Sequence, residues 1–228
     1  MIKHIFLDLD GTLLDFHKAE AKALKKVLFI LGIFPTPDKI KLYSRINNLQ
    51  WKRLEKGEIE REEVIIGRFK IFFKEIGEDK NCLEARNLYE KYLSQGHYFI
   101  DGAEKLLDEL SNKYCLYLAT NGTKTVQQGR IKSAGIEKYF NHIFVSEDIG
   151  FNKPDKRFFD SCFKKIENFD KSQAVIIGDS LSSDILGGKN ANIKTVWFNP
   201  LKAENDLNIL PDKQVYSLCE IPDVLLEL

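Results

Sequence analysis

The spacing of apolar residues changes twice along the chain, near residue 17 and near residue 102. Before the first change, residues 3–9 form a short, mostly apolar run that is typical of a buried strand. In this run Leu7 and Leu9 alternate with Asp8 and Asp10, so on an extended segment both carboxylates point to one side. The chain therefore opens with a predicted strand that carries two acids at its carboxyl end.

Between residues 18 and 96, apolar residues recur at intervals of three and four, which is the spacing of amphipathic helices. Four glycines divide this stretch where helix ends are expected: Gly32, Gly57, Gly77 and Gly96. Because no segment here alternates like a strand, we expect four helices that pack as a unit of their own.

After Gly102, strand-like and helix-like segments alternate. Short apolar runs predict four strands, at 115–119, 142–145, 174–177 and 195–198. Helical segments are predicted at 103–112, 124–134, 156–166 and 183–190. This alternation indicates an α/β fold, in which a Rossmann-like parallel sheet is covered by helices on both faces.

Length and charge define the class of protein and exclude some partners. A chain of 228 residues can bury the core of one large domain or of one domain with an insertion. Its 34 basic and 34 acidic residues cancel, so no overall field attracts nucleic acid or an anionic membrane. No apolar run approaches the length that spans a bilayer. We expect no nucleic-acid or membrane partner, and the sequence identifies no protein partner.

The cysteines and the N-terminus indicate the cellular compartment in which the protein is expected. The four cysteines are far apart, include no C-x-x-C pair and lie at positions 82, 115, 162 and 219. A chain of this size does not need disulfides to fold, which favours reduced thiols. The first residues lack the basic, apolar and small-residue regions of a signal peptide. We therefore expect a cytoplasmic protein.

Candidate chemistry begins at Asp8-Leu9-Asp10-Gly11-Thr12. Two like charges so close together are costly unless a cation or a shared proton relieves them. Mg²⁺, a hard cation that prefers oxygen ligands, is the simplest relief. An ordinary acidic turn is the alternative, but this five-residue pattern arises by chance in only about one chain in several hundred of this size. The segment therefore favours a catalytic or metal-binding role.

Further polar residues follow other predicted strands, at the sheet edge where ligands of parallel sheets bind. Thr120-Asn121 offers a hydroxyl and backbone N–H groups that could seat a phosphate oxygen, although such residues are also ordinary in turns. Lys153, whose backbone is restrained by Pro154, could neutralise a phosphoryl group, although a loop lysine is usually a solvated surface charge.

Two more acids follow the fourth of these strands. Asp179 comes directly after the apolar run and has the setting of a metal ligand. Asp184 lies at the start of a predicted helix, where an acid also complements the helix dipole. The sequence signal for Asp184 as a ligand is therefore less specific than the signal for Asp179.

In chain order, the set Asp8-x-Asp10-Gly11-Thr12, Thr120-Asn121, Lys153-Pro154 and Gly178-Asp179-x4-Asp184 resembles the four motifs of the haloacid dehalogenase superfamily. The resemblance covers nearly the whole chain. It implies that residues 16–96 are a helical cap domain inserted after the first strand. Residues 1–15 and 97–228 would then form the Rossmann-like core domain, with 13–17 at the position of a mobile flap.

The resemblance implies a Mg²⁺-dependent hydrolase of phosphomonoesters. Asp8 would be the nucleophile that forms an aspartyl phosphate, and Asp10 would be the general acid and base. Thr120 and Lys153 would act as the phosphate-binding pair. Since dehalogenases of the superfamily lack the second acid, the presence of Asp10 favours phosphate transfer over dehalogenation.

The same resemblance implies a set of metal ligands. Asp8 and Asp179 would bind Mg²⁺ through their carboxylates, and Asp10 would bind it through its backbone carbonyl. Asp184 would steady the ion. All four contribute oxygen, as this cation requires.

A closer resemblance is to the capped nucleotidases that act on pyrimidine nucleoside 5′-monophosphates. The matching segments include Asn47, Trp51, Gly57-x-Ile59, Gly67-Arg68-Phe69, Gln127-Gln128-x-Arg130, Ser146-Glu147, Ile185-Leu186-Gly187-Gly188 and Trp197-x-Asn199. Because phosphate is common to all candidate substrates, specificity must come from groups that touch the leaving alcohol. We expect an aromatic side chain, Trp51, Phe16 or Phe69, to stack on the base.

Other functions share much of this pattern. A phosphatase of sugar phosphates or of N-acylneuraminate 9-phosphate would use the same catalytic residues. A sugar phosphomutase would return the phosphoryl group to a second hydroxyl and would need a bisphosphate activator. A non-catalytic, metal-binding regulatory protein would turn over no aryl phosphate in the presence of Mg²⁺.

Overall fold

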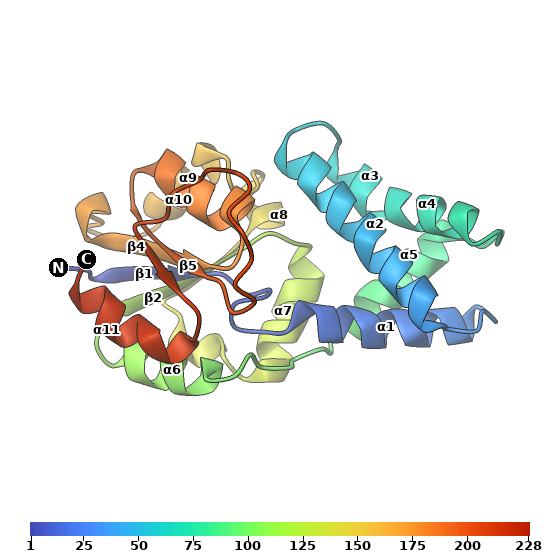
Figure 1. Cartoon of the computed structure of the whole chain (residues 1–228), viewed down its shortest axis with the longest axis horizontal. Helices are drawn as coiled ribbons and strands as arrows, with labels where there is room; N and C mark the ends of the chain where they lie inside the picture. Colours follow the sequence, from blue (N-terminus) through green and yellow to red (C-terminus); the bar gives the residue numbers. More distant parts are fainter.

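The computed structural model describes all residues, 1–228, as an α/β part beside a bundle of helices (Figure 1). The sheet and its covering helices lie at one end of the molecule, and the bundle lies at the other. Both chain termini are at the end of the α/β part that faces away from the bundle. No helix combines the length and the apolar character needed to cross a membrane.

The sheet has six strands, all parallel, in the order β3-β2-β1-β4-β5-β6. The strands are β1 (His4–Leu7), β2 (Cys115–Thr120), β3 (His142–Val145), β4 (Ala174–Gly178), β5 (Lys194–Phe198) and β6 (Lys213–Val215). The chain builds outward from β1 in one direction and then in the other. The order therefore reverses between β1 and β4, and ligands of such sheets bind beyond the strand ends at this point.

Helices cover both faces of the sheet, as its apolar strands require. One face packs against α6 (Ala103–Ser111), α7 (Lys124–Ala134) and α11 (Ile221–Leu226). The other packs against α9 (Lys156–Phe163) and α10 (Leu186–Ala191). Alternation along β1 sends Leu7 to the first face and Phe6 to the second. The predicted α/β fold with a parallel sheet and a helical insertion is confirmed.

The helices between β1 and α6 pack around a core of their own. They are α1 (Phe16–Ile30), α2 (Pro37–Glu55), α3 (Arg61–Ile65), α4 (Gly67–Glu75) and α5 (Cys82–Leu93), and we call them the helical bundle. Aromatic side chains fill its centre, where Tyr43, Phe69 and Tyr89 are buried against one another. Val126 of α7 is the one buried member of this cluster from the α/β part. Domain boundaries at residues 16 and 97 stay a prediction.

Several element predictions were wrong in detail. The bundle has five helices, not four, because the third predicted helix is interrupted at Ile66, beside Gly67, a poor helix former. Strand β6 was missed because its three residues, Lys-Gln-Val, carry almost no apolar signal. The segment predicted as a helix at 183–190 begins as a π-helical turn, η3 (Leu181–Ile185), which runs into α10.

Four short elements were not predicted. They are α8 (Ser146–Ile149) and the single-turn 3₁₀ helices η1 (Glu137–Tyr139), η2 (Lys171–Gln173) and η4 (Leu218–Glu220). Helix α11 was also missed, although its apolar side chains Ile221 and Leu225 are buried against the sheet. Helices of one or two turns are too short to show a helical period in sequence.

Candidate active site

The register of the central strands brings distant acids to one edge of the sheet. Leu7, the last residue of β1, pairs with Ile177 of β4, and the backbone N–H of Asp8 donates to the Ile177 carbonyl at 3.0 Å. Asp8 therefore lies beside the end of β4, where Asp179 leaves the strand. Both residues follow apolar strands whose burial fixes their position.

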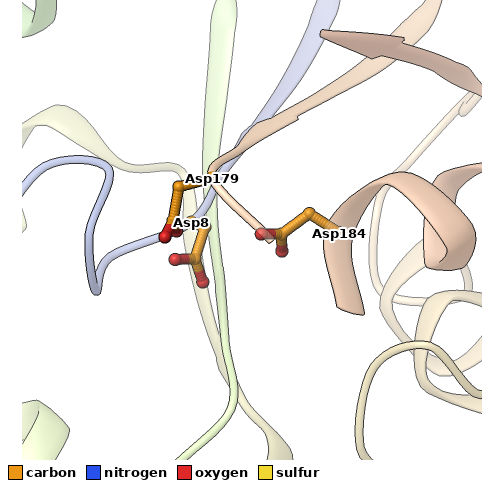
Figure 2. A group of neighbouring side chains, drawn as sticks. All are labelled: Asp8, Asp179 and Asp184. Atoms are coloured by element: carbon orange, nitrogen blue, oxygen red, sulfur yellow. The ribbon is translucent and has the colours of Figure 1, made fainter. Parts of the chain in front are cut away.

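Three carboxylates meet at this edge (Figure 2). Asp8, Asp179 and Asp184 each offer one oxygen, and these oxygens all lie within 4.8 Å of one another. Asp184 reaches the cluster from η3, with its carboxylate turned toward the other two. Carboxylates at this spacing match the oxygen donors that hard divalent cations prefer.

Two glycines make room for these acids. A Cβ on Gly11 would lie 2.4 Å from an oxygen of Asp179, and the φ of +82° at Gly11 is itself unfavourable for other residues. A Cβ on Gly178 would lie 2.2 Å from the carboxyl carbon of Asp184. The two glycines of the sequence motifs are therefore required by the packing of the carboxylates.

Lys153 places a cation among the acids. Its Nζ donates to Oδ1 of Asp8, to Oδ1 of Asp184 and to the carbonyl of Ala119, each at 2.6 Å. The side chain is only 1% exposed, so these contacts replace water entirely. Burial alone would lower the pKa of Lys153, but the charges of Asp184 and Asp8 outweigh it and raise the pKa.

Asn121 fixes the backbone that presents this lysine. Its side-chain amide donates to the Lys153 carbonyl, and its side-chain oxygen accepts from the Lys153 N–H, both at 2.9 Å. Thr120, one residue earlier at the end of β2, is fully buried, and its hydroxyl oxygen accepts from Gln127 at 2.7 Å. The structure thus joins Thr120, Asn121 and Lys153 at the same edge as the acids.

The electrostatics of the cluster call for a further positive charge. Burial, reinforced by the neighbouring acids, raises the pKa of Asp8 well above its usual range. Burial and the charge of Asp184 raise the pKa of Asp179 to about 7. With all three acids ionised, only one ammonium group opposes three carboxylates. The excess of two negative charges fits a divalent cation, which would restore the ionised state of these acids.

Asp10 stands apart from the three clustered acids. Its Oδ2 accepts from Nε2 of Gln127 at 2.9 Å, and its Oδ1 accepts from Nη1 of Arg130. Gln127 and Arg130 both belong to α7, so this helix holds the second acid of the motif. The sequence pattern of these two residues was part of the resemblance to nucleotidases, but their contact with Asp10 was not predicted.

A cleft of about 400 Å³ opens above the acids, between the sheet and the helical bundle. From the sheet side it is lined by Asp8, Asp10, Thr120, Asn121, Asp179 and Asp184. From the bundle side it is lined by Phe16, Asn47, Trp51, Glu55, Arg68 and Glu90. Phe16 and Trp51 therefore face the same cleft as the acids. Phe69, the third aromatic residue singled out from the sequence, does not reach the cleft, because it is fully buried in the core of the bundle.

Two side chains of the bundle reach across to the sheet. Arg61 donates to the Gly122 carbonyl at 2.8 Å, to the Ser146 hydroxyl at 2.8 Å and to Oδ1 of Asn152 at 2.5 Å. The hydroxyl of Ser182 donates to Glu55 at 3.0 Å, and burial raises the pKa of this glutamate to about 6. Neither residue was predicted, since a charged side chain on a helix gives no sequence signal of its partner.

Known proteins are similar to this chain in sequence. Residues 5–198 match the family described as haloacid dehalogenase-like hydrolase. The chain is 38% identical to YfnB of Bacillus subtilis over 97% of its own length and 94% of that protein. It is 38% identical to the pyrimidine 5′-nucleotidase PynA of Streptococcus pneumoniae, over 98% of this chain and 94% of PynA. The pyrimidine 5′-nucleotidase YjjG of Escherichia coli is 29% identical, with 97% and 96% covered.

A solved structure agrees with these matches. The crystal structure of YfnB bound to magnesium, which reveals interdomain movement, superposes with a TM-score of 0.94. It is 37% identical, and the superposition covers 98% of each chain. The fold, the order of the motifs and the match over most of the length all point the same way: this chain is a member of the haloacid dehalogenase-like hydrolase family.

Proposed function

We propose that this protein is a Mg²⁺-dependent phosphomonoester phosphatase that acts on pyrimidine nucleoside 5′-monophosphates. The observation that carries the proposal is the position of Asp8, which is buried between Lys153 and two further acids at the floor of a cleft. The names of PynA and YjjG, both pyrimidine 5′-nucleotidases, support the substrate class.

In the first step an oxygen of the Asp8 carboxylate attacks phosphorus, and the bond from phosphorus to the leaving oxygen breaks. Asp10, in its protonated form, gives its proton to the leaving alcohol. Lys153 offsets the repulsion between the carboxylate and the incoming anion, since its Nζ already contacts Asp8. The product of this step is an aspartyl phosphate on Asp8.

In the second step a water oxygen attacks the phosphorus of the aspartyl phosphate. Asp10, now ionised, takes a proton from this water, and the bond between phosphorus and the Asp8 oxygen breaks. Inorganic phosphate leaves, and both aspartates return to their starting states. Thr120 and the backbone N–H groups that follow it would bind the phosphoryl oxygens.

Asp8, Asp179 and Asp184 would hold Mg²⁺, with the backbone carbonyl of Asp10 completing the protein ligands. The donor set fits, because it is all oxygen and its three carboxylates, opposed by Lys153 alone, leave an excess of two negative charges. When bound, the ion would polarise the phosphoryl group and compensate its negative charge.

The cleft suits a leaving group larger than a small sugar. Its volume of about 400 Å³ accepts a nucleotide, and the bundle side offers the ring of Trp51 for stacking. Polar partners for a base are also present on that side. Asn47 and Arg68 line the cleft, fixed by hydrogen bonds from Arg68 to Asn47 and from Asn47 to Glu20, each 2.9 Å long.

The proposal is tested by phosphate release from a panel of substrates. The panel contains UMP, dUMP, dTMP, a purine nucleotide, glucose 6-phosphate, N-acylneuraminate 9-phosphate and an aryl phosphate, each with Mg²⁺. We expect the highest kcat/KM for the pyrimidine nucleotides, and a loss of more than about 1,000-fold in Asp8→Asn, which lacks the nucleophile. Release from no substrate, with bound metal demonstrated, would instead indicate a regulatory protein.

Base recognition is tested separately with Trp51→Ala and Phe16→Ala. Loss of a stacking ring should reduce kcat/KM for dUMP by about 5- to 20-fold, which corresponds to roughly 1–2 kcal/mol of aromatic contact. In Trp51→Ala it should leave hydrolysis of a sugar phosphate nearly unchanged. In Phe16→Ala, which also removes the ring beside Arg130, both rates should fall, but the rate for dUMP should fall more. If the ratio of rates for dUMP and the sugar phosphate stays the same in both variants, these rings do not recognise the base.

A further inference from the structure

We propose that Arg130 is a positioning residue for the reaction, which holds the Asp10 carboxylate and joins it to the two segments that connect the helical bundle to the sheet. This inference rests on the proposed function, because it assigns the role of Arg130 through that of Asp10. Three contacts of one buried guanidinium group carry it.

The first contact is with the acid itself. Nη1 of Arg130 pairs with Oδ1 of Asp10, while Gln127 donates to Oδ2 at 2.9 Å. Both carboxylate oxygens are thus held by side chains from α7. Arg130 is fully buried, whereas Asp10 keeps about a quarter of its side chain exposed toward the cleft. The carboxylate therefore faces the cleft in one orientation, which α7 sets.

The other two contacts are with the bundle connections. Nε of Arg130 donates to the Gly96 carbonyl at 3.0 Å, on the segment that returns from α5 to the sheet. The guanidinium also lies 5.7 Å from the ring centre of Phe16, the first residue of α1. One side chain therefore touches the entry to the bundle, the exit from it and the second acid.

The two connections are themselves paired. Leu14 forms an antiparallel bridge with Phe99, and the Asp15 N–H donates to the Tyr98 carbonyl at 2.7 Å. A shift of the bundle relative to the sheet must move both segments together. Through the Gly96 carbonyl and the Phe16 ring, such a shift would act on the guanidinium that holds Asp10.

Arginine suits this task better than lysine would. Its donors lie in a rigid planar fork, so the bond to Asp10 and the bond to Gly96 fix one another's direction. Proton transfer requires the acid to lie within hydrogen-bond reach of the leaving oxygen. A displacement of about 1 Å can cost about 100-fold in rate, so orientation of Asp10 is a large effect.

A positioning role can be separated from a structural one by changing the leaving group. The ribose 5′-oxygen of UMP needs the proton of Asp10, whereas 2,4-dinitrophenolate leaves as a stable anion without it. For both substrates, hydrolysis of the aspartyl phosphate still needs Asp10 as the base. A misplaced Asp10 should therefore slow both steps with UMP but only the second step with dinitrophenyl phosphate.

The experiment compares the Arg130→Met variant with the unmutated protein by rapid mixing, in saturating Mg²⁺. We expect kcat for UMP to fall about 100-fold, with KM changed less than about threefold. With dinitrophenyl phosphate we expect a rapid release of nearly one dinitrophenolate per enzyme molecule, followed by slow turnover. A first release well below one dinitrophenolate per enzyme molecule would show that the first step is slowed as well. It would mean that Arg130 only maintains the fold and would overturn the proposal.

Two further variants keep the test decisive. If Arg130→Met does not fold, Arg130→Lys retains the buried charge but not the planar fork, and should show the same pattern with a smaller loss. Lys132→Met removes an exposed cation from the same helix and should change neither step. If the unmutated protein hydrolyses no phosphomonoester at all, the proposed function fails before the role of Arg130 is reached.

Discussion

At the scale of single residues, the site depends on a glycine whose lack of a side chain leaves room for an acid. Gly178 ends β4, and the space that a Cβ would take there is filled by the carboxyl group of Asp184. The closeness of this contact means that any side chain at 178 must displace Asp184. The displaced acid would also lose its 2.6 Å contact with Lys153.

We therefore expect Gly178→Ala to raise the Mg²⁺ concentration for half-maximal activity by about 10- to 100-fold, because a displaced acid no longer supports the metal. Titration of activity with MgCl₂ measures this shift. Gly67→Ala is the matched control, since nothing lies within 4 Å of a Cβ there and α4 begins at this residue. An unchanged metal requirement in Gly178→Ala would show that Asp184 does not support the ion.

Sequence reasoning worked well for residues whose position follows from a strand end. Asp8, Thr120 and Asp179 each follow a short apolar run, so the meeting of parallel strands predicts that they lie together. It failed for Arg130 and Arg61, because periodicity places a charge on a helix but does not show what that charge faces. Their partners, Asp10 and the loops after β2 and β3, depend on tertiary packing.

At the scale of elements, the five-residue helix α3 connects the helical bundle to the sheet. Its first residue, Arg61, donates three hydrogen bonds to segments that follow β2 and β3. These bonds join the bundle to the sheet at a second place, apart from the paired connections at Leu14 and Phe99. The bundle is thus connected to the sheet through contacts at two separate places.

Loss of the α3 contacts should weaken substrate binding more than stability. In Arg61→Ala we expect KM to rise about fivefold, roughly 1 kcal/mol for the net value of the lost hydrogen bonds. The melting temperature should change little, because the bundle keeps its own aromatic core. Steady-state kinetics and a thermal melt test both statements.

Arg53→Ala is the control for this variant. Arg53 is half exposed, and its guanidinium group pairs with Glu58 and donates to Gln50, both between β1 and α6 and away from the sheet. It should leave KM unchanged. A KM that stays constant in Arg61→Ala as well would show that the α3 contacts do not contribute to closure of the cleft.

The elements themselves were predictable to different degrees. Helix α7 and strand β3 have the predicted ends, because clear turn residues flank them. Strand β6 and the interruption at Ile66 have no comparable signal, since their conformation is imposed by the neighbouring sheet and bundle. Tertiary contacts override weak local preference in both places.

At the scale of the whole molecule, charge balance conceals a strong local imbalance. The chain has equal numbers of acidic and basic residues, yet three acids crowd around one lysine at the cleft. The pKa of Asp179 is raised from 3.8 to about 7 in the folded protein. Without metal, the stability that protonated Asp179 contributes is fully present below pH 3.8. It is lost as the pH rises from 3.8 to about 7.

Mg²⁺ should therefore stabilise the protein more at pH 8 than at pH 5. At pH 5 Asp179 is protonated, and the proton competes with the ion for its carboxylate. At 100 times its Kd the ion adds about 2.7 kcal/mol. For a chain of this size that corresponds to an increase of about 5–10 °C in melting temperature. Thermal melts with and without MgCl₂ at both pH values measure the difference.

Asp179→Asn provides the comparison, because its amide neither titrates nor carries charge to the metal. The variant should show little Mg²⁺ stabilisation at either pH. Equal stabilisation of the unmutated protein at pH 5 and pH 8 would contradict the assignment of Asp179 as a ligand.

The placement of the chain termini has a practical consequence. Both ends emerge at the end of the α/β part that faces away from the helical bundle (Figure 1). An affinity tag, a fluorescent protein or a surface anchor joined at either terminus would therefore sit far from incoming substrate.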